Sequence, residues 1–287
     1  MHAELSAIRT RPLGKTGVNV TQVGLGGEGV LRTYNLFDDA DKVIDAAVSG
    51  GITYFDSAHA YAHSENYYGR YWSQNLDARK NIFQTSKSAR RDREGALEEL
   101  DRTLKAMNIG HLDLWQIHDV RTQSDIRAIE SPDGALEAFL QARDEGKTRF
   151  IGVTGHYDPD ILTYCVENWP VDTVLLPVNP VEAVIGGFMD KTLQAARDKK
   201  LGIIGMKVVG ASYYIIPDAG VYADTLIRYA LSQDISCAIV GCSTSGEVRT
   251  LLDAGRDFIP MSKKEQDALV NKFRPYAKQL SYYRKKT

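Results

Sequence analysis

The segment Leu112-Asp113-Leu114-Trp115-Gln116-Ile117-His118-Asp119 begins as a largely apolar run and ends in two polar residues. An amphipathic run, Arg93–Met107, comes just before it and carries its apolar residues at helical spacing. A nearly continuous apolar strand is typical of parallel sheets, because helices cover both faces of such sheets. The segment therefore predicts a helix, a buried strand and a polar strand end, in that order.

The same alternation continues along the 287 residues. It favours an α/β chain folded as a (β/α)8 TIM barrel over an open doubly wound sheet, in a single domain of residues 1–287. We expect a β-hairpin at Arg11–Val20 and an added C-terminal helix at Ser262–Gln279. The expected strands are Val20–Leu25, Ile52–Phe55, Ile82–Thr85, Leu112–Ile117, Phe150–Val153, Thr173–Val178, Ile203–Met206 and Cys237–Val240. The expected helices are Asp38–Val48, Arg93–Met107, Ala135–Arg143, Pro159–Val166, Phe188–Arg197, Ala223–Leu231 and Glu247–Ala254.

Composition and charge argue against several classes of protein. With 35 basic and 37 acidic residues, the net charge of −2 gives no electrostatic case for a nucleic-acid or membrane-surface partner. No apolar run approaches the ~18 residues of a membrane span, and Met1–Thr10 lacks the apolar run of a signal peptide. Cys165, Cys237 and Cys242 show no metal-binding or disulfide spacing. We expect a soluble cytoplasmic protein, with Arg284-Lys285-Lys286 as a solvated terminus.

Four polar residues follow three consecutive expected strands. Asp56 and Tyr61 follow the second strand, Lys87 the third and His118 the fourth. Taken singly, they could be a helix cap, a packing tyrosine, a surface lysine and a core histidine. Because the carboxyl ends of barrel strands converge on one mouth, where TIM-barrel active sites lie, their coincidence predicts a shared site.

These residue types suit proton transfer to a carbonyl oxygen. A free phenol has a pKa of about 10 and is a reluctant acid at neutral pH. A nearby lysine ammonium stabilises the phenolate, and an aspartate holds that lysine in place. A histidine can orient the substrate oxygen, so the set predicts Tyr61 as a general acid or base.

Three segments, Phe55–Tyr61 with Ser64-Glu65, Thr85-Ser86-Lys87 and Gln116-Ile117-His118, resemble the signature segments of the aldo-keto reductases. Other resembling segments, from about residue 11 to 280, are Arg11–Gly17, Gly146–Gly152, Gly202–Val208 and Ile239–Ser245. The resemblance implies an NAD(P)H-dependent oxidoreductase that reduces aldehydes or ketones to alcohols, or runs in reverse on sugars or other alcohols. It implies the catalytic tetrad Asp56, Tyr61, Lys87 and His118, a small-molecule carbonyl or alcohol substrate, and no metal.

The resemblance also implies an extended nicotinamide cofactor lying across the barrel mouth. The candidate cofactor contacts are Gly27, Asp56, His156, Asn179, Met206, Lys207, Val208, Gly210, Gly241, Cys242, Ser243, Thr244, Glu247 and Val248. Many relatives hold the carboxamide with Ser-Asn after strand five and glutamine at the end of strand six. This chain has Thr154-Gly155-His156 and Pro177–Pro180 there, which leaves His156 and Asn179 as candidates. Many relatives stack an aromatic ring after strand seven, where this chain has Met206-Lys207, as in a branch with Gly-Met-Lys-Val.

Two arguments about the cofactor conflict. The resemblance favours NADP(H) over NAD(H), and the hydroxyls of Ser243, Thr244 and Ser245 could bind a 2′-phosphate. Glu247, however, stands where many relatives carry arginine, and Arg249 would point about 200° away on a helix. Glu247 would repel a phosphate and could accept from a ribose diol, or it could be a first-turn residue favoured by the helix dipole. We retain NADP(H) as the expected cofactor, with NAD(H) as the alternative.

Two other functions fit parts of the sequence. His59 and His63, spaced for one helix face, could share a metal with Asp56 or His118 in a barrel hydrolase, although Gly26-Gly27 stands where a His-x-His would be expected. A cofactor-binding subunit without activity is the second alternative, against which the intact tetrad argues.

Substrate specificity in such barrels comes from loops at the mouth. The polar loop Asp119–Pro132 is short, and the aromatic segment Ala211–Pro217 could line a pocket. Tyr282-Tyr283 could close over that pocket or could simply pack.

Overall fold

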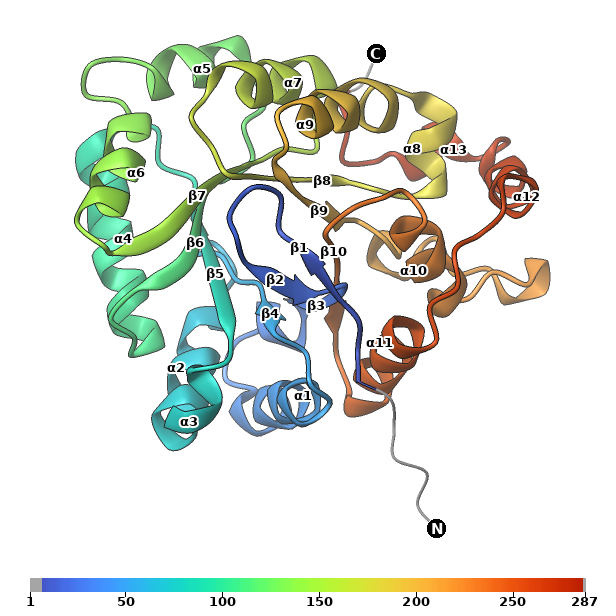
Figure 1. The fold of residues 1–287 in the computed structure, drawn as a ribbon, viewed down its shortest axis with the longest axis horizontal. Coiled ribbons are helices and arrows are strands. Elements are labelled where there is room, and N and C mark those ends of the chain that lie inside the picture. Colours follow the sequence, from blue (N-terminus) through green and yellow to red (C-terminus); the bar gives the residue numbers. More distant parts are fainter. Residues whose placement is uncertain (1–6, 286–287) are drawn as a thin grey trace.

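Eight parallel strands close into a barrel in the order β10-β3-β4-β5-β6-β7-β8-β9 (Figure 1). The computed structural model describes residues 7–285. The barrel strands are β3 (Val23–Gly29), β4 (Tyr54–Phe55), β5 (Phe83–Ser88), β6 (Leu112–Ile117), β7 (Thr148–Thr154), β8 (Thr173–Pro177), β9 (Gly202–Met206) and β10 (Cys237–Cys242). Consecutive strands are neighbours, as repeated right-handed βα units require. The expected (β/α)8 barrel is confirmed.

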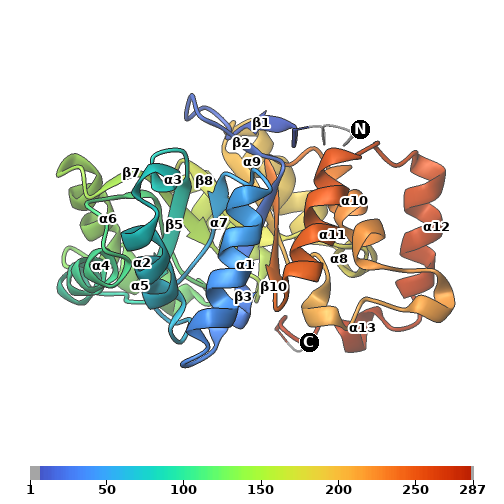
Figure 2. The same cartoon turned by 90° about the horizontal axis from the view of Figure 1, so that it is seen from below.

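The helices surround the barrel (Figures 1 and 2). They are α1 (Phe37–Ser49), α2 (Ser64–Gln74), α3 (Leu76–Arg79), α4 (Arg93–Met107), α5 (Gln123–Ile129), α6 (Ala135–Asp144), α7 (Pro159–Asn168), α8 (Pro180–Ile185), α9 (Leu193–Asp198), α10 (Ala223–Leu231), α11 (Ser245–Arg256), α12 (Lys263–Phe273) and α13 (Ala277–Leu280). The bounds of α4 and α10 are those predicted. Asp92 caps α4 by accepting from the N–H of Gly95, and Asn108 ends it in the left-handed conformation.

Several predicted elements have slightly different bounds in the structure, and three differ in the sheet to which they belong or in the kind or continuity of helix. Val20 belongs to the hairpin, where it pairs with Arg11, and the first barrel strand begins at Val23. The predicted helix Phe188–Arg197 starts with a π-helical turn over Phe188–Thr192. The predicted helix Ser262–Gln279 is split into α12 and α13, because Pro275 has no N–H and clashes with the preceding helical turn.

The hairpin of β1 (Thr10–Pro12) and β2 (Asn19–Thr21) covers the end of the barrel at which the strands begin. Arg11 donates to the carbonyls of Leu231 and Ile235 at 3.1 and 2.8 Å. Gly14 has φ +56, and a Cβ there would lie 2.2 Å from the backbone nitrogen of Gly202, so only glycine fits. The hairpin does not cover the opposite end of the barrel, where the strands finish.

Part of the sequence-based interpretation lies outside the described residues. This holds for most of the segment Met1–Thr10 and for Lys286 of the basic terminus. Within residues 7–285, no helix has the length and apolar character needed to span a bilayer.

Candidate active site

Lys87 lies near the carboxyl end of β5, at the end of the barrel where the strands finish, and its side chain is 1% exposed. Its ammonium donates to Asp56 Oδ2 at 2.7 Å and to the carbonyl of Ser57 at 2.6 Å. The second carboxylate oxygen, Oδ1, accepts from the hydroxyl of Thr85 at 3.0 Å. Burial lowers the pKa of Lys87, and the charge of Asp56 opposes that shift. A buried ion pair persists only when further hydrogen bonds satisfy it, and here both carboxylate oxygens are bonded.

Tyr61 lies beside this ion pair and is half-buried. The Lys87 ammonium is 4.7 Å from the centroid of the Tyr61 ring, and the Arg32 guanidinium carbon is 5.0 Å from it. The ring of His118 meets it edge-on, with centroids 5.6 Å apart. A Cβ on Gly27 would lie 2.7 Å from the Tyr61 ring, so glycine there makes room for that ring. The four polar residues expected at the strand ends therefore lie together.

The pKa of Tyr61 is shifted in the direction opposite to that expected from the sequence. Burial raises it well above the ordinary value of 10.0, and the charges of Asp56 and Glu28 raise it further. The Lys87 ammonium directs its hydrogen bonds to Asp56 and to Ser57, so much of its charge is offset by the carboxylate. Tyr61 is consequently a neutral phenol at neutral pH, with a proton available to donate.

His118 directly follows β6, and its Nδ1 is buried without a hydrogen-bond partner among residues 7–285. Burial lowers the pKa of His118 well below 6.5, and the charges of Lys87 and His156 lower it further, so the imidazole is neutral. Asp119 directly follows His118 in the sequence. Its carboxylate pairs with Arg121 at 2.6 Å and lies 3.5 Å from His156 Nε2.

The two candidates for a carboxamide contact differ in how available they are. The Nδ1 of His156 is buried and has no hydrogen-bond partner in the described part of the chain. The amide of Asn179 is fully buried and already engaged. Its Nδ2 donates to the carbonyl of Lys207 at 3.1 Å and to the hydroxyl of Tyr283 at 3.2 Å, while Oδ1 accepts from the N–H of Glu182 at 3.0 Å. A new ligand would therefore meet an orphaned polar atom at His156 but would have to displace partners at Asn179.

The other candidate cofactor contacts follow β9 and β10. Met206 is the last residue of β9. Lys207 follows it with a left-handed backbone conformation, φ 54. Burial lowers the pKa of the Lys207 ammonium. Gly210 has φ +55 and a Cβ there would lie 2.6 Å from the Tyr214 ring, while a Cβ on Gly241 would lie 2.6 Å from Glu28 Cβ, so both glycines make room for the chain's own residues. Three further candidates have buried side chains and offer a ligand only backbone groups: Val208, Cys242 and Val248.

Side chains at the start of α11 already form hydrogen bonds with nearby backbone N–H groups. The Thr244 hydroxyl caps the helix by accepting from the N–H of Glu247 at 3.2 Å. The Glu247 carboxylate in turn accepts from the N–H of Ser243 at 2.6 Å. Helix N-termini attract anions through free N–H groups and the helix dipole. Here the Glu247 carboxylate binds the N–H of Ser243, just ahead of the N-cap residue Thr244, and Glu247 lies in the first helical turn, as one of the two interpretations predicted.

The sequence model of the Aldo/keto reductase family matches residues 22–214. The chain belongs to this family. It is 29% identical over 181 residues to L-galactose dehydrogenase of Arabidopsis thaliana, covering 59% of this chain and 55% of that one. It is also 29% identical over 159 residues to aldo-keto reductase str7 of Strobilurus tenacellus, covering 50% and 45%. The chain thus spans about half the length of these curated relatives.

A solved structure has the same fold as this aldo-keto reductase. The aldo-keto reductase AKR11C1 from Bacillus halodurans, described as a holo form, superposes with a TM-score of 0.76. The match covers 92% of this chain and 96% of that chain at 16% sequence identity. At that identity the likeness supports the barrel and leaves the substrate open.

The geometry expected for a metal-dependent hydrolase is wrong. His59 lies ahead of α2, with its Nδ1 3.3 Å from Glu65 Oε2, whereas His63 is the N-cap position of that helix and packs against Tyr34. The two histidines therefore do not share a helix face. Among residues 7–285, no group of three or more His, Cys, Asp or Glu side chains is placed to hold a metal ion.

Several residues at the mouth were missed or misread from the sequence. Glu28 and Arg32 pair at 2.8 Å beside Tyr61, and their i,i+4 spacing after the first strand was the available signal. The interpretation of Arg284 as part of a solvated terminus is wrong. Its guanidinium is 13% exposed and pairs at 2.8 Å with Glu182, which is fully buried. Since an unpaired buried carboxylate is costly, Glu182 holds the end of the chain at the barrel mouth.

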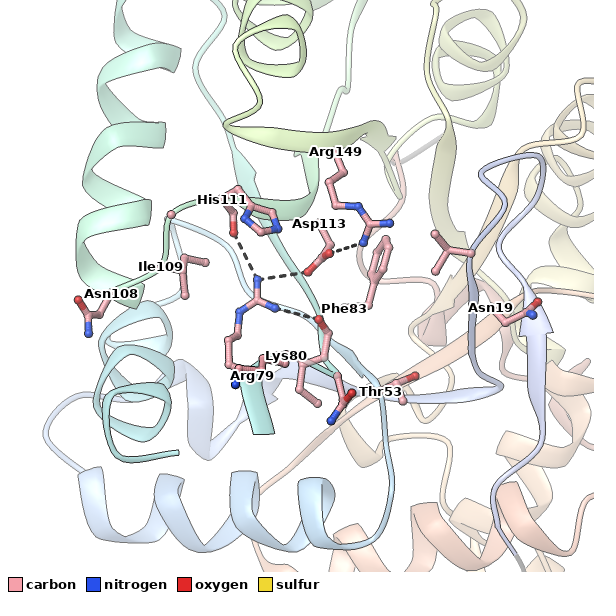
Figure 3. Close-up of a pocket in the computed structure, with 14 residues that line it drawn as sticks. Asn19, Thr53, Arg79, Lys80, Phe83, Asn108, Ile109, His111, Asp113 and Arg149 are labelled. Carbon is pink, nitrogen blue, oxygen red and sulfur yellow. Dashed lines mark hydrogen bonds and ion pairs between the residues drawn. The ribbon is translucent and has the colours of Figure 1, made fainter. Parts of the chain in front are cut away.

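A pocket of about 530 Å³ opens at the other end of the barrel, beside the hairpin (Figure 3). There the buried carboxylate of Asp113 accepts from Arg79 at 3.3 Å and from Arg149 at 2.7 Å. Asp113 also accepts from the backbone N–H of Gln84 at 2.9 Å, which ties two strand starts together. Residues at this end of TIM barrels serve stability, so we place the chemistry at the opposite mouth.

Proposed function

We propose that this aldo-keto reductase is an NAD(P)H-dependent oxidoreductase that reduces an aldehyde or ketone to an alcohol, or runs the reverse reaction. The observation that carries the proposal is the convergence of Asp56, Tyr61, Lys87 and His118, with a buried, hydrogen-bonded ion pair against a neutral phenol. When bound, the nicotinamide cofactor supplies or accepts the hydride.

The chain's own residues handle the proton and the carbonyl oxygen. Tyr61, a neutral phenol at neutral pH, donates its hydroxyl proton to the oxygen in reduction and takes a proton back in oxidation. His118, a neutral imidazole, orients that oxygen by hydrogen bonding. Lys87, held by Asp56, places a fixed cation beside the phenol ring, while the charge of Asp56 disfavours the phenolate and so favours its return to the neutral form.

The residues at the mouth fit a nicotinamide dinucleotide. The unpartnered Nδ1 of His156 suits a carboxamide. The Lys207 ammonium suits a pyrophosphate. These residues, with the start of α11, would hold the cofactor.

The start of α11 favours NAD(H) in our proposal, against the family habit. Glu247 offers a carboxylate where a 2′-phosphate would need a cation, and it already uses the N–H of Ser243. A ribose diol can donate to that carboxylate, whereas a phosphate would be repelled by it.

Turnover of a reactive aldehyde such as 4-nitrobenzaldehyde with NADH and with NADPH tests the proposal. Wild-type turnover that is lost in Tyr61→Phe, with dinucleotide affinity preserved, supports it. Dinucleotide binding without turnover of any aldehyde, ketone or sugar in a panel would instead identify a non-catalytic binding subunit, against which the assembled tetrad argues.

A further inference from the structure

The last described residues of the chain cross the mouth over β7, β8 and β9. The N–H of Lys285 donates to the carbonyl of Tyr157 at 2.9 Å, and the hydroxyl of Tyr214 donates to the carbonyl of Leu280 at 3.1 Å. Between these ties, Tyr283 is 8% exposed. Figure 2 shows this terminus at the opposite end of the barrel from the hairpin. The tail therefore forms part of the mouth that holds the tetrad.

The hydroxyl of Tyr283 is anchored in a buried polar cluster. It donates to Glu182 Oε1 at 2.8 Å and accepts from Asn179 Nδ2 at 3.2 Å. Arg284 completes the cluster by donating to Glu182 Oε2 at 2.8 Å and to the carbonyl of Gly186 at 2.7 Å. Both oxygens of the fully buried Glu182 carboxylate thus depend on the tail.

The ring of Tyr283 lies beside His156, the candidate contact for the nicotinamide carboxamide, and near Lys207, the candidate contact for the pyrophosphate. The His156 ring meets it edge-on, with centroids 5.7 Å apart, and the Lys207 ammonium is 5.9 Å from its centroid. Tyr283 therefore brings an aromatic ring from the far end of the sequence to the side of His156, with the Tyr282 ring edge-on to it at a centroid distance of 5.2 Å.

Tyr283 could either line the cofactor site permanently or block it until the tail detaches. The free-energy cost of detaching the tail decides between these two roles. Removing Tyr283 and Arg284 would leave the Glu182 carboxylate buried without partners. Breaking a buried pair in this way disfavours the detached state by on the order of a hundredfold or more. A cofactor that had to displace Tyr283 would lose that factor in affinity, so the attached ring is better understood as part of the binding site.

We propose that Tyr283 is a positioning residue of the cofactor site, whose ring forms the wall against which the nicotinamide end packs. The inference rests on the proposed function, because it requires that the mouth bind a nicotinamide dinucleotide. Glu182 and Arg284 fix the ring before the cofactor arrives, which lowers the ordering cost of binding.

The test compares NADH with ADP-ribose, the fragment that lacks nicotinamide, in fluorescence or calorimetric titrations. Tyr283→Ala should weaken NADH binding by about 5- to 150-fold, the range typical of losing an aromatic stacking partner, and leave ADP-ribose binding unchanged. Tyr283→Phe keeps the ring and should restore most of the NADH affinity. Tyr276→Ala removes a 56%-exposed aromatic near the same terminus and should change neither affinity. If wild type prefers the phosphorylated cofactor, NADPH and 2′-phospho-ADP-ribose replace the two probes.

The outcomes separate this inference from the proposed function. Unchanged NADH affinity in Tyr283→Ala overturns the inference alone, and tighter NADH binding would identify Tyr283 as a residue that blocks the site. Equal losses for NADH and ADP-ribose also overturn it, because they would indicate general damage to the mouth. A wild-type chain that binds neither dinucleotide overturns the proposed function and this inference together.

Discussion

Replacing Glu247 by arginine should change which nicotinamide dinucleotide the enzyme prefers. In the wild type, the Glu247 carboxylate accepts from the N–H of Ser243 at 2.6 Å, at the start of α11. A 2′-phosphate placed there would meet a negative charge and would lose one N–H donor. We therefore expect the wild type to favour NADH and Glu247→Arg to shift the preference toward NADPH.

The size of the shift follows from the change in charge. Two unit charges about 4 Å apart interact by about 1 kcal/mol in water. The substitution changes the side-chain charge by two units, while Glu247 is exposed and screening by solvent and salt reduces the effect. About 1–2 kcal/mol remains, which is about 5- to 30-fold in the NADPH/NADH ratio of kcat/KM. Glu247→Gln removes one charge, keeps an acceptor for Ser243, and should give about half of that free energy.

The assay is steady-state kcat/KM for both dinucleotides with one reference aldehyde, at low and high salt. The shift should shrink as salt increases, because it is electrostatic. Arg249→Ala is the matched control, since Arg249 points about 200° around the helix from Glu247 and should leave the ratio unchanged. A wild type that prefers NADPH, with the same ratio in Glu247→Arg, would refute the reasoning and leave Glu247 as a helix-start residue only.

Three further predictions follow from the buried groups. Tyr61→Phe should cut turnover by about 10²–10⁴-fold, the usual worth of a positioned proton donor, with unchanged dinucleotide affinity; retained activity would contradict the assignment. Lys87→Met should lower the free energy of unfolding by about 3–5 kcal/mol, because it leaves Asp56 buried without its cation. The double variant Lys87→Met with Asp56→Asn should regain much of the lost free energy of unfolding, as measured by chemical denaturation. If the effects of the two substitutions simply add, Lys87 and Asp56 are not energetically coupled. Burial raises the pKa of Glu182 from 4.5 to about 7, so the folded chain holds this proton more tightly than the unfolded chain. The resulting stability is present in acid and is lost as pH rises from about 4.5 to about 7, by up to about 3 kcal/mol; Glu182→Gln should abolish this component of the pH dependence.

The barrel was predictable because each of its signals is local. Amphipathic periodicity and apolar strand runs repeat along the chain, and α4 shows the same bounds in sequence and structure. Barrel geometry then brings the strand ends together, so Lys87 and His118 could be placed at one mouth without knowledge of any contact. The predicted start of the first barrel strand at Val20 is wrong, because the hairpin and that strand are nearly contiguous and both are apolar there.

The details of the site depend on contacts that sequence spacing does not show. The ion pair of Arg284 and Glu182 joins positions 102 residues apart, and a charged chain terminus is ordinarily solvated. The direction of the Tyr61 pKa shift depends on burial and on how Asp56 offsets Lys87, which requires coordinates. The role of Glu247 had a readable signal, because Thr244 and Glu247 have the spacing of a capping box.

The two ends of the barrel show why the tetrad, and not ion pairing alone, carries the functional argument. Asp113 with Arg79 and Arg149 is also a buried carboxylate bonded to cations, but it joins strand starts beneath the hairpin. Asp56 with Lys87 is the same chemistry at the strand ends, where a half-buried phenol and a neutral imidazole lie against it. Apolar side chains of similar volume could often replace a buried pair without loss of stability. An ion pair of this kind, placed beside groups that can exchange a proton, is most readily explained by the reaction that we propose.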